Sequence, residues 1–282
     1  MAFKDILLSL TTYPSPTPAF AIEAPIAFAA ATGARISAVA CEIKFRVPGS
    51  VLGNMLLDIP AMVTTEIKKS ATSAEELLSA FQSAAEKEGV FGERITEQCL
   101  TSETADVLVE HARLRDLTIV PVSDGDHVAQ WYAQSIIFGS GKPTLVMPHI
   151  RKRTSAFALD TVAVAWDFSR PAARAVADAL PILKKAKQVY IVTITNEKSI
   201  SGRRSAEELA RNLVSHDVHV ILDTADAGGR GIGEVLTSYV DSVDGDILVM
   251  GAYGHSRMRD FILGGATRSM VSKPPVPIFL SH

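Results

Sequence analysis

The stretch that decides the fold is Asp246-Ile247-Leu248-Val249-Met250-Gly251-Ala252-Tyr253-Gly254, which Gly264-Gly265-Ala266-Thr267 follows after nine further residues. Its first part is a short apolar run typical of a buried strand, and Gly251 ends that run. Glycines at these positions allow a tight turn and a close approach of the backbone to a ligand. The residues after Gly264 are predicted to begin a helix, whose N-terminal N–H groups favour an anion such as phosphate.

The spacing Gly251-x-x-Gly254-x9-Gly264 resembles the nucleotide-binding signature of the universal stress protein family. That family normally has Ser or Thr after the third glycine, whereas this chain has Gly265, and its nearest hydroxyl group is that of Thr267. The resemblance implies an adenine nucleotide as ligand, ATP or else AMP or ADP. The alternative is a glycine-rich turn that only closes an α/β unit.

Composition excludes several classes of protein. The chain has 282 residues, 47% of them hydrophobic and 21% charged, which suits one large globular domain or two ordinary ones. A formal net charge of −3 gives no overall basic field for nucleic acid. No apolar run is long enough to cross a membrane, and the first residues do not resemble a secretory signal, so we expect a cytoplasmic protein. Cys41 and Cys99 are expected to be reduced, buried thiols.

Predicted strands and helices alternate along the chain, as in proteins with a parallel sheet. In the first half, strands are predicted at 5–10, 35–43, 95–100, 117–122 and 143–147, and helices at 19–32, 66–88, 105–115 and 127–138. Segment 45–61 has no regular period, yet it is too apolar for a solvated loop. We expect this segment to cover a face of its domain or to contact a partner.

The second half repeats this order of elements. Strands are predicted at 161–166, 188–195, 218–222, 247–250 and 276–280, and helices at 171–185, 205–216 and 234–243, with another from 266. Duplication best explains such a repeat. In the first half, however, only Gly125 resembles the signature after the fourth strand, and Thr11-Thr12 ends the first strand without an acidic residue. We therefore interpret the first half as a degenerate copy.

The resemblance to universal stress proteins covers nearly the whole chain, as two tandem copies. It implies an α/β fold of two doubly wound, five-stranded parallel-sheet domains. We expect residues 1–150 to form the degenerate domain, 151–158 a linker, and 159–282 the domain with the nucleotide-binding motif. Because members of the family commonly dimerise, the resemblance also implies a pseudo-dimer of the two halves within one chain. A homodimer of the whole chain is a second option.

Ligands of open α/β sheets bind at the carboxyl ends of strands, where the strand order reverses. In the second half, Asp167 ends the first strand, and it matches the acidic residue with which the family contacts the nucleoside. Its alternative role is the N-cap of the helix that Pro171 starts. The resemblance places Ala165, Ile194 and Met250 near the adenine and Gly251, Gly254, Gly264, Gly265 and Thr267 near the phosphates. The three apolar residues are otherwise ordinary core residues.

Further polar residues near the motif have two interpretations each. His255, Arg257 and Arg259 lie between the second and third glycines, where they could meet phosphates or belong to a solvated loop. Asp223, Asp226 and Glu234 could bind a magnesium ion through their carboxylates, although surface aspartates are common. No motif presents a nucleophile together with its base, so no catalytic residue is assigned.

Three hypotheses follow from these patterns. The first is a cytoplasmic stress-response protein that binds an adenine nucleotide in its second half and changes shape or partner affinity with occupancy. The second is an interaction protein of the same fold that binds no nucleotide. The third is a weak nucleotide hydrolase, against which the missing acid–base set argues.

Overall fold

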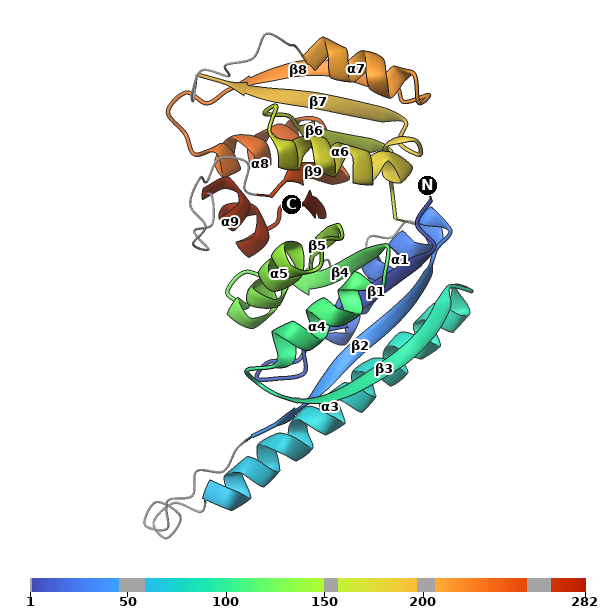
Figure 1. Ribbon diagram of the computed structural model, residues 1–282, viewed down its shortest axis with the longest axis vertical. Coiled ribbons are helices and arrows are strands. Elements are labelled where there is room, and N and C mark those ends of the chain that lie inside the picture. Colours follow the sequence, from blue (N-terminus) through green and yellow to red (C-terminus); the bar gives the residue numbers. More distant parts are fainter. Residues whose placement is uncertain (1, 46–58, 150–156, 197–205, 253–264) are drawn as a thin grey trace.

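The structure is a computed structural model that describes residues 2–45, 59–149, 157–196, 206–252 and 265–282. Ten strands of these residues form one sheet, in the order β3-β2-β1-β4-β5-β10-β9-β6-β7-β8, and helices cover both of its faces (Figure 1). The first half of the chain supplies β1 to β5, and the second half supplies β6 to β10.

The strands of the first half are β1 (Asp5–Leu10), β2 (Arg35–Lys44), β3 (Phe91–Leu100), β4 (Leu117–Val122) and β5 (Thr144–Pro148). Its helices are α1 (Glu23–Thr32), α3 (Ile59–Lys87), α4 (Thr104–Arg113) and α5 (His127–Gly139), with a short 3₁₀ helix at Ala19–Ile22. The strands of the second half are β6 (Thr161–Ala165), β7 (Gln188–Thr195), β8 (Val220–Asp226), β9 (Ile247–Gly251) and β10 (Ile278–Ser281). Its helices are α6 (Arg170–Leu183), α7 (Ala206–Val214), α8 (Ile232–Ser242) and α9 (Gly265–Ser272).

The two halves have the same strand order and meet at one antiparallel pair. Within each half the strands are parallel, whereas β5 and β10 run in opposite directions, with Val146 opposite Ile278 and Thr144 opposite Leu280. The predicted α/β fold of two doubly wound, five-stranded parallel sheets is confirmed. The sequence pattern did not predict that both sheets join at their edges into one, because it carries no sign of which edges pair.

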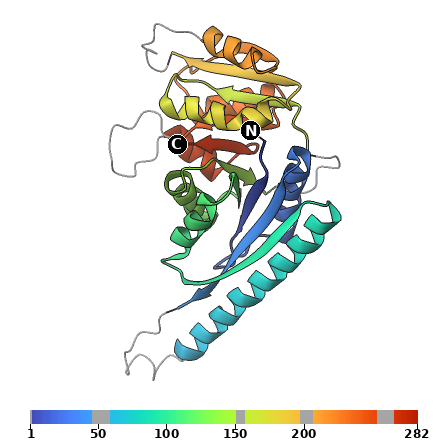
Figure 2. The same ribbon diagram turned by 45° about the vertical axis from the view of Figure 1, so that its right-hand side comes forward.

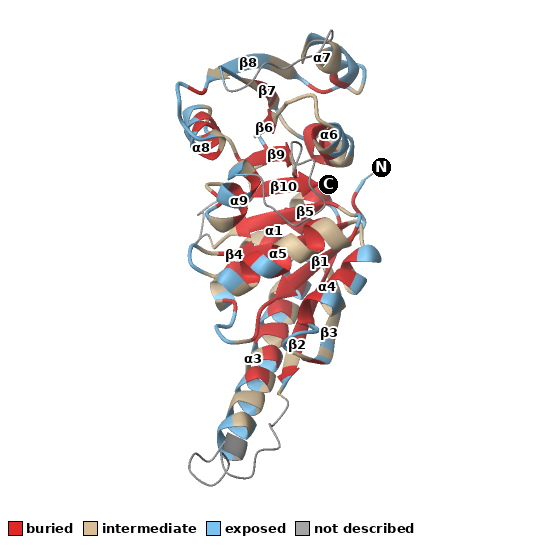
Figure 3. Cartoon of the chain, turned by 60° about the vertical axis from the view of Figure 1, so that its left-hand side comes forward, coloured by how far each residue is buried: buried red, intermediate tan, exposed pale blue. Residues whose placement is uncertain are grey.

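The hydrophobic core lies on both faces of the sheet and runs through both halves. Successive side chains of a strand point to opposite faces. Leu8 and Val164 belong to one buried cluster with residues of α1, α3, α6 and α7, whereas Leu7 and Ala163 belong to another with residues of α4, α5, α8 and α9. Figure 3 shows this buried band continuing from one half into the other. Each face is therefore a shared core, and burial of its apolar area stabilises the junction of the halves.

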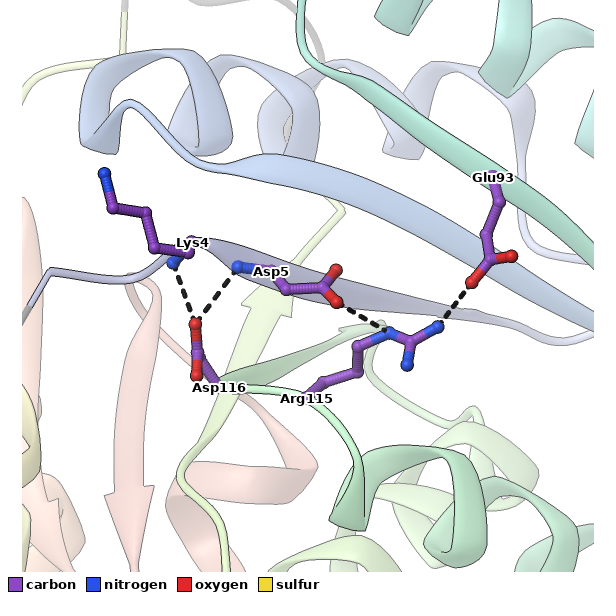
Figure 4. A network of polar contacts seen from close by, with 5 residues as sticks. All are labelled: Lys4, Asp5, Glu93, Arg115 and Asp116. Atoms are coloured by element: carbon purple, nitrogen blue, oxygen red, sulfur yellow. Dashed lines mark hydrogen bonds and ion pairs between the residues drawn. The ribbon is translucent and has the colours of Figure 1, made fainter.

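Two equivalent aspartates fasten the strand beginnings in the two halves. Their carboxylates accept hydrogen bonds from consecutive backbone N–H groups: Asp116 from Lys4 and Asp5 at 2.8 and 3.1 Å, and Asp246 from Asp160 and Thr161 at 2.9 and 3.0 Å. In the first half Arg115 adds ion pairs with Asp5 and Glu93 (Figure 4). The same pair of bonds at equivalent positions is a structural trace of the repeat.

Helix α3 and strands β2 and β3 extend away from the rest of the molecule (Figures 1 and 2). The helix predicted at 66–88 begins earlier, at Ile59, since Pro60 is compatible with a first helical turn. Strand β3 also begins earlier than predicted, at Phe91, because pairing with β2 includes residues without an apolar pattern. Residues 46–58, most of the apolar segment 45–61, lie outside the described residues.

Elements at the edge of the sheet differ most from prediction. Strand β8 was predicted at 218–222 but spans Val220–Asp226, because its backbone pairs with β7 while several of its polar side chains are exposed. Cys41 and Cys99 are buried free thiols, as expected, and a hydrogen bond with Cys99 together with burial raises the pKa of Cys41. Among the helices in the described ranges, none has the length and apolar character to cross a membrane.

Candidate functional site

The candidate site lies where the strand order of the second half reverses, between β6 and β9. These strands are parallel neighbours, and Val164 pairs with Val249 near their carboxyl ends. The chain leaves β6 toward α6 on one face of the sheet and leaves β9 toward α9 on the other. Asp167 and Gly251 therefore meet at one edge of the sheet, where ligands of such folds bind.

The turn from β6 into α6 is held by its own side chains. The Asp167 carboxylate accepts a hydrogen bond from the Ser169 backbone N–H at 2.9 Å. The Ser169 hydroxyl in turn accepts one from the Ala172 N–H at 3.2 Å, so the N-cap of α6 is Ser169 and not Asp167. Between them Phe168 has a φ of 61°, which is unusual for a bulky residue and occurs most often at functional sites.

Sequence reasoning missed Ser169 and Phe168. The Ser169-Arg170-Pro171 sequence was the available signal for the cap, because Ser precedes many helices and Pro favours their first turn. The backbone conformation of Phe168 has no signature in a single sequence.

Gly251 is required by packing against α6. A Cβ atom at this position would lie 2.6 Å from the Pro171 carbonyl carbon and 2.9 Å from Ala172 Cα. The predicted close approach at Gly251 is therefore an approach of the first turn of α6. The described residues show no open space at this side of the glycine.

Three predicted site residues share one apolar cluster. Ala165, Ile194 and Met250 come from β6, β7 and β9 and lie on the face of the sheet that α8 and α9 cover. Met250 is buried, whereas Ala165 and Ile194 are partly exposed. The structure brings these three side chains to one face near the strand ends, where they could line an apolar ring.

The predicted phosphate-binding end is described only in part. Gly265 is the exposed first residue of α9, its φ is outside the left-handed region, and a Cβ atom there would meet no atom of the described residues within 4 Å. Thr267 is 3% exposed, so its side chain faces the packed interior. Gly254 and Gly264 lie outside the described residues, as do the cations expected between them, His255, Arg257 and Arg259.

Two of the candidate magnesium ligands are engaged in other contacts. Asp226 accepts hydrogen bonds from the Gly228 backbone N–H at 2.9 Å and from Asn196 at 3.1 Å, and the bond from Gly228 is the main cause that lowers the pKa of Asp226. Asp223 accepts a hydrogen bond from the Tyr239 hydroxyl at 3.0 Å. No group of three acidic, His or Cys residues suited to a metal ion occurs in the described part of the chain.

The equivalent place in the first half is built differently. Helix α5 begins at His127, directly after the short turn that follows β4, whereas 13 residues, 252–264, separate β9 from α9. Asp126 caps α5 by accepting a hydrogen bond from the Ala129 N–H at 3.0 Å. A carboxylate thus occupies the helix N-terminus at which a phosphate would bind.

Comparison with known proteins places the chain by its structure. Neither a protein-family model nor a curated protein matches it. A universal stress protein from Archaeoglobus fulgidus DSM 4304 superposes with a TM-score of 0.70 at 15% identity, over 98% of this chain and 95% of that one. A protein named as a universal stress protein from Pseudomonas aeruginosa UCBPP-PA14 gives 0.57 at 14% identity, over 99% and 93%.

A functionally unknown protein from Pseudomonas aeruginosa PAO1 is a third similar structure, with a TM-score of 0.54 at 13% identity, over 99% of this chain and 92% of that one. All three likenesses extend over nearly the full length of both chains. The chain therefore has the fold of universal stress proteins, and the resemblance noted from its glycine spacing is confirmed at the level of the fold.

Proposed function

We propose that the chain is a cytoplasmic stress-response module that binds an adenine nucleotide, ATP in the first instance, in its second half. One observation carries the proposal: the β6–α6 turn, an apolar face and the carboxyl end of β9 lie where the strand order reverses. This is the edge at which open α/β sheets bind nucleotides.

Each part of the site has a separate task in this proposal. Asp167 would accept hydrogen bonds from nucleoside hydroxyls or a base edge, and Ala165, Ile194 and Met250 would contact the adenine ring. The phosphates would bind backbone N–H groups at Gly264 and Gly265, where the N-terminus of α9 favours negative charge. We assign no protein ligand to magnesium, because Asp223 and Asp226 already accept hydrogen bonds from the protein.

The first test is mass analysis of small molecules that are released when freshly purified protein is denatured, followed by calorimetric titration with ATP, ADP and AMP. An adenine nucleotide in the released fraction and saturable heat with ATP are expected. Absence of both would favour an interaction protein that binds no nucleotide, and steady turnover of ATP would favour a hydrolase.

A pair of matched variants locates the site. Gly265→Glu adds a negative charge at the first residue of α9, where an added Cβ atom meets none of the described residues, and should weaken ATP binding strongly. His127→Glu adds the same charge at the exposed first residue of α5 and should leave binding unchanged. Equal effects of the two variants would contradict a site in the second half.

A further inference from the structure

Helix α5 of the first half contacts α9 directly and is linked to Ala252, which follows β9, through His282. The two helices α5 and α9 lie side by side across the junction of the halves (Figures 1 and 3). Helix α5 is therefore the part of the first half that is best placed to act on the site of the second.

The end of α9 is held by a buried side chain of α5. Gln130 is 7% exposed, and its amide nitrogen donates hydrogen bonds to the Ser272 carbonyl at 3.2 Å and to the Ser123 carbonyl at 3.3 Å. Ser272 is the last residue of α9, where helix carbonyls lack partners within the helix. The ion pair of Lys273 with Asp124, at 3.2 Å, adds a second contact that is exposed to solvent and therefore weak.

A second link connects α5 with Ala252, through the side chain of His282. Ala252 follows β9 directly, is fully buried, and donates its backbone N–H to the Ser281 carbonyl at 2.8 Å. Its own carbonyl lies 3.2 Å from Nδ1 of His282. The His282 ring packs edge-on against Phe138 of α5, with ring centroids 5.1 Å apart.

We propose that α5 is the positioning element of the candidate nucleotide site, acting through Gln130 on α9 and through the Phe138–His282 contact on Ala252. This inference rests on the proposed function. Helix α9 has only eight residues, so its ends are about 12 Å apart at 1.5 Å per residue, and a shift at Ser272 moves Gly265 as well. The first half thus sets the geometry of a site to which it contributes no ligand.

Two variants remove these contacts, and a third is their control. Gln130→Met keeps the size of the side chain but removes the donor to α9, and His282→Ala removes the ring at the end of the chain. Lys185→Met is the control, because the Lys185 ammonium also donates across the halves, to the Ala31 carbonyl at 2.8 Å, but in the last turn of α1. All three proteins are compared as full chains for thermal stability, ATP affinity and hydrogen exchange of the amides in 265–272.

We expect the three variants to have similar thermal stability but to differ in ATP affinity and in amide exchange of α9. Gln130→Met and His282→Ala should bind ATP about fivefold more weakly, within the range that mutations along a coupling network produce. Gln130→Met should also speed amide exchange in α9, whereas Lys185→Met should leave both affinity and exchange in α9 unchanged. Because His282 is exposed, its variant is informative even if Gln130→Met does not fold.

The outcomes distinguish this inference from the proposed function. If the unaltered protein binds ATP and both α5-contact variants bind it equally well, the inference is overturned and the function stands. If the unaltered protein binds no nucleotide, the function fails, and exchange in α9 decides by itself whether α5 positions that helix. Exchange that is unchanged in Gln130→Met would then overturn the inference too.

Discussion

At the scale of residues, the physical environments of Gly251 and Gly265, two glycines of one motif, place different demands on the side chain. Gly251 stands where the backbone of α6 leaves no room for a Cβ atom, whereas a Cβ atom at Gly265 would meet none of the described residues and its φ is outside the left-handed region. Gly251 is thus a requirement of the fold. Gly265 is not required by the fold in this way, and under the proposed function the missing hydroxyl there would affect ligand binding alone.

Gly265→Ser should tighten ATP binding by about tenfold, because a hydrogen bond to a charged group contributes roughly 1.5–3 kcal/mol and 1.4 kcal/mol corresponds to tenfold. No backbone strain opposes the change, since the φ of Gly265 is not in the left-handed region. Calorimetric titration at constant salt measures the effect. Unchanged affinity in a stable variant would count against phosphate at this helix end.

Gly251→Ala should destabilise the protein by about 1–3 kcal/mol, because its Cβ atom forces the first turn of α6 away from β9. Gly265→Ala is the matched control and should change the free energy of unfolding little, since its Cβ atom meets none of the described residues. Urea unfolding of both variants checks the difference. Equal free energies of unfolding in the two variants would show that α6 can move away from β9 without loss of stability.

Tyr132 gives a prediction in alkaline solution. Burial raises the pKa of Tyr132 to about 12, and the side chain is 3% exposed. A tyrosine whose pKa is about 10 when unfolded then contributes stability that is present below pH 10 and is lost as the pH rises toward 12. The difference in unfolding free energy between the unaltered protein and Tyr132→Phe should therefore shrink over this range. A difference that stays constant with pH would contradict a raised pKa of Tyr132.

At the scale of elements, the paired aspartates show how each half fastens its central strand. Asp116 and Asp246 precede β4 and β9, and each binds the beginning of the neighbouring strand, β1 or β6. Both are single-residue links between elements that are distant in sequence. Because both halves have the same pair of hydrogen bonds, the effect of removing one aspartate can be compared with the effect of removing the other.

Asp116→Ala and Asp246→Ala should each lower the free energy of unfolding by about 2–3 kcal/mol, because two backbone N–H groups lose a charged acceptor. Asp241→Ala, at an exposed position of α8, is the control and should have little effect. Chemical denaturation measures all three. A loss in only one of the paired variants would mean that the halves do not use this link equally.

At the scale of the whole molecule, the shared sheet makes each half depend on the other. The β5–β10 pair and both faces of the core continue across the junction, where Phe28 packs against Phe157 and Phe3 against Phe279. Cutting the chain between the halves would expose these rings and two apolar strand edges.

Halves expressed separately should therefore aggregate or bind each other when mixed, and the intact chain should unfold in one cooperative transition. Sedimentation velocity of each half, alone and mixed, makes the test. Halves that are monomeric, stable and indifferent to one another would contradict an interdependent sheet.

The sequence by itself predicts the buried centre of this protein well. Strands β1 and β4 have the predicted bounds, because nearly continuous burial demands an apolar run that is visible in the residues. The position of the carboxyl ends of β6 and β9 at one edge of the sheet also follows, since the two strands are parallel. Edge elements such as β8 are less predictable, because exposed strands need backbone pairing but no apolar pattern.

Only the tertiary structure decides what these residues touch. In the structure, Gly251 packs against the first turn of α6, and Ser169 is the N-cap of that helix. Gln130 of the other half donates a hydrogen bond to the last residue of α9. The tertiary structure also joins two predicted sheets into one through β5 and β10. The physical reason is the range of the contacts: burial and helix period act between near neighbours and leave a pattern in sequence, whereas a single contact between distant residues leaves none.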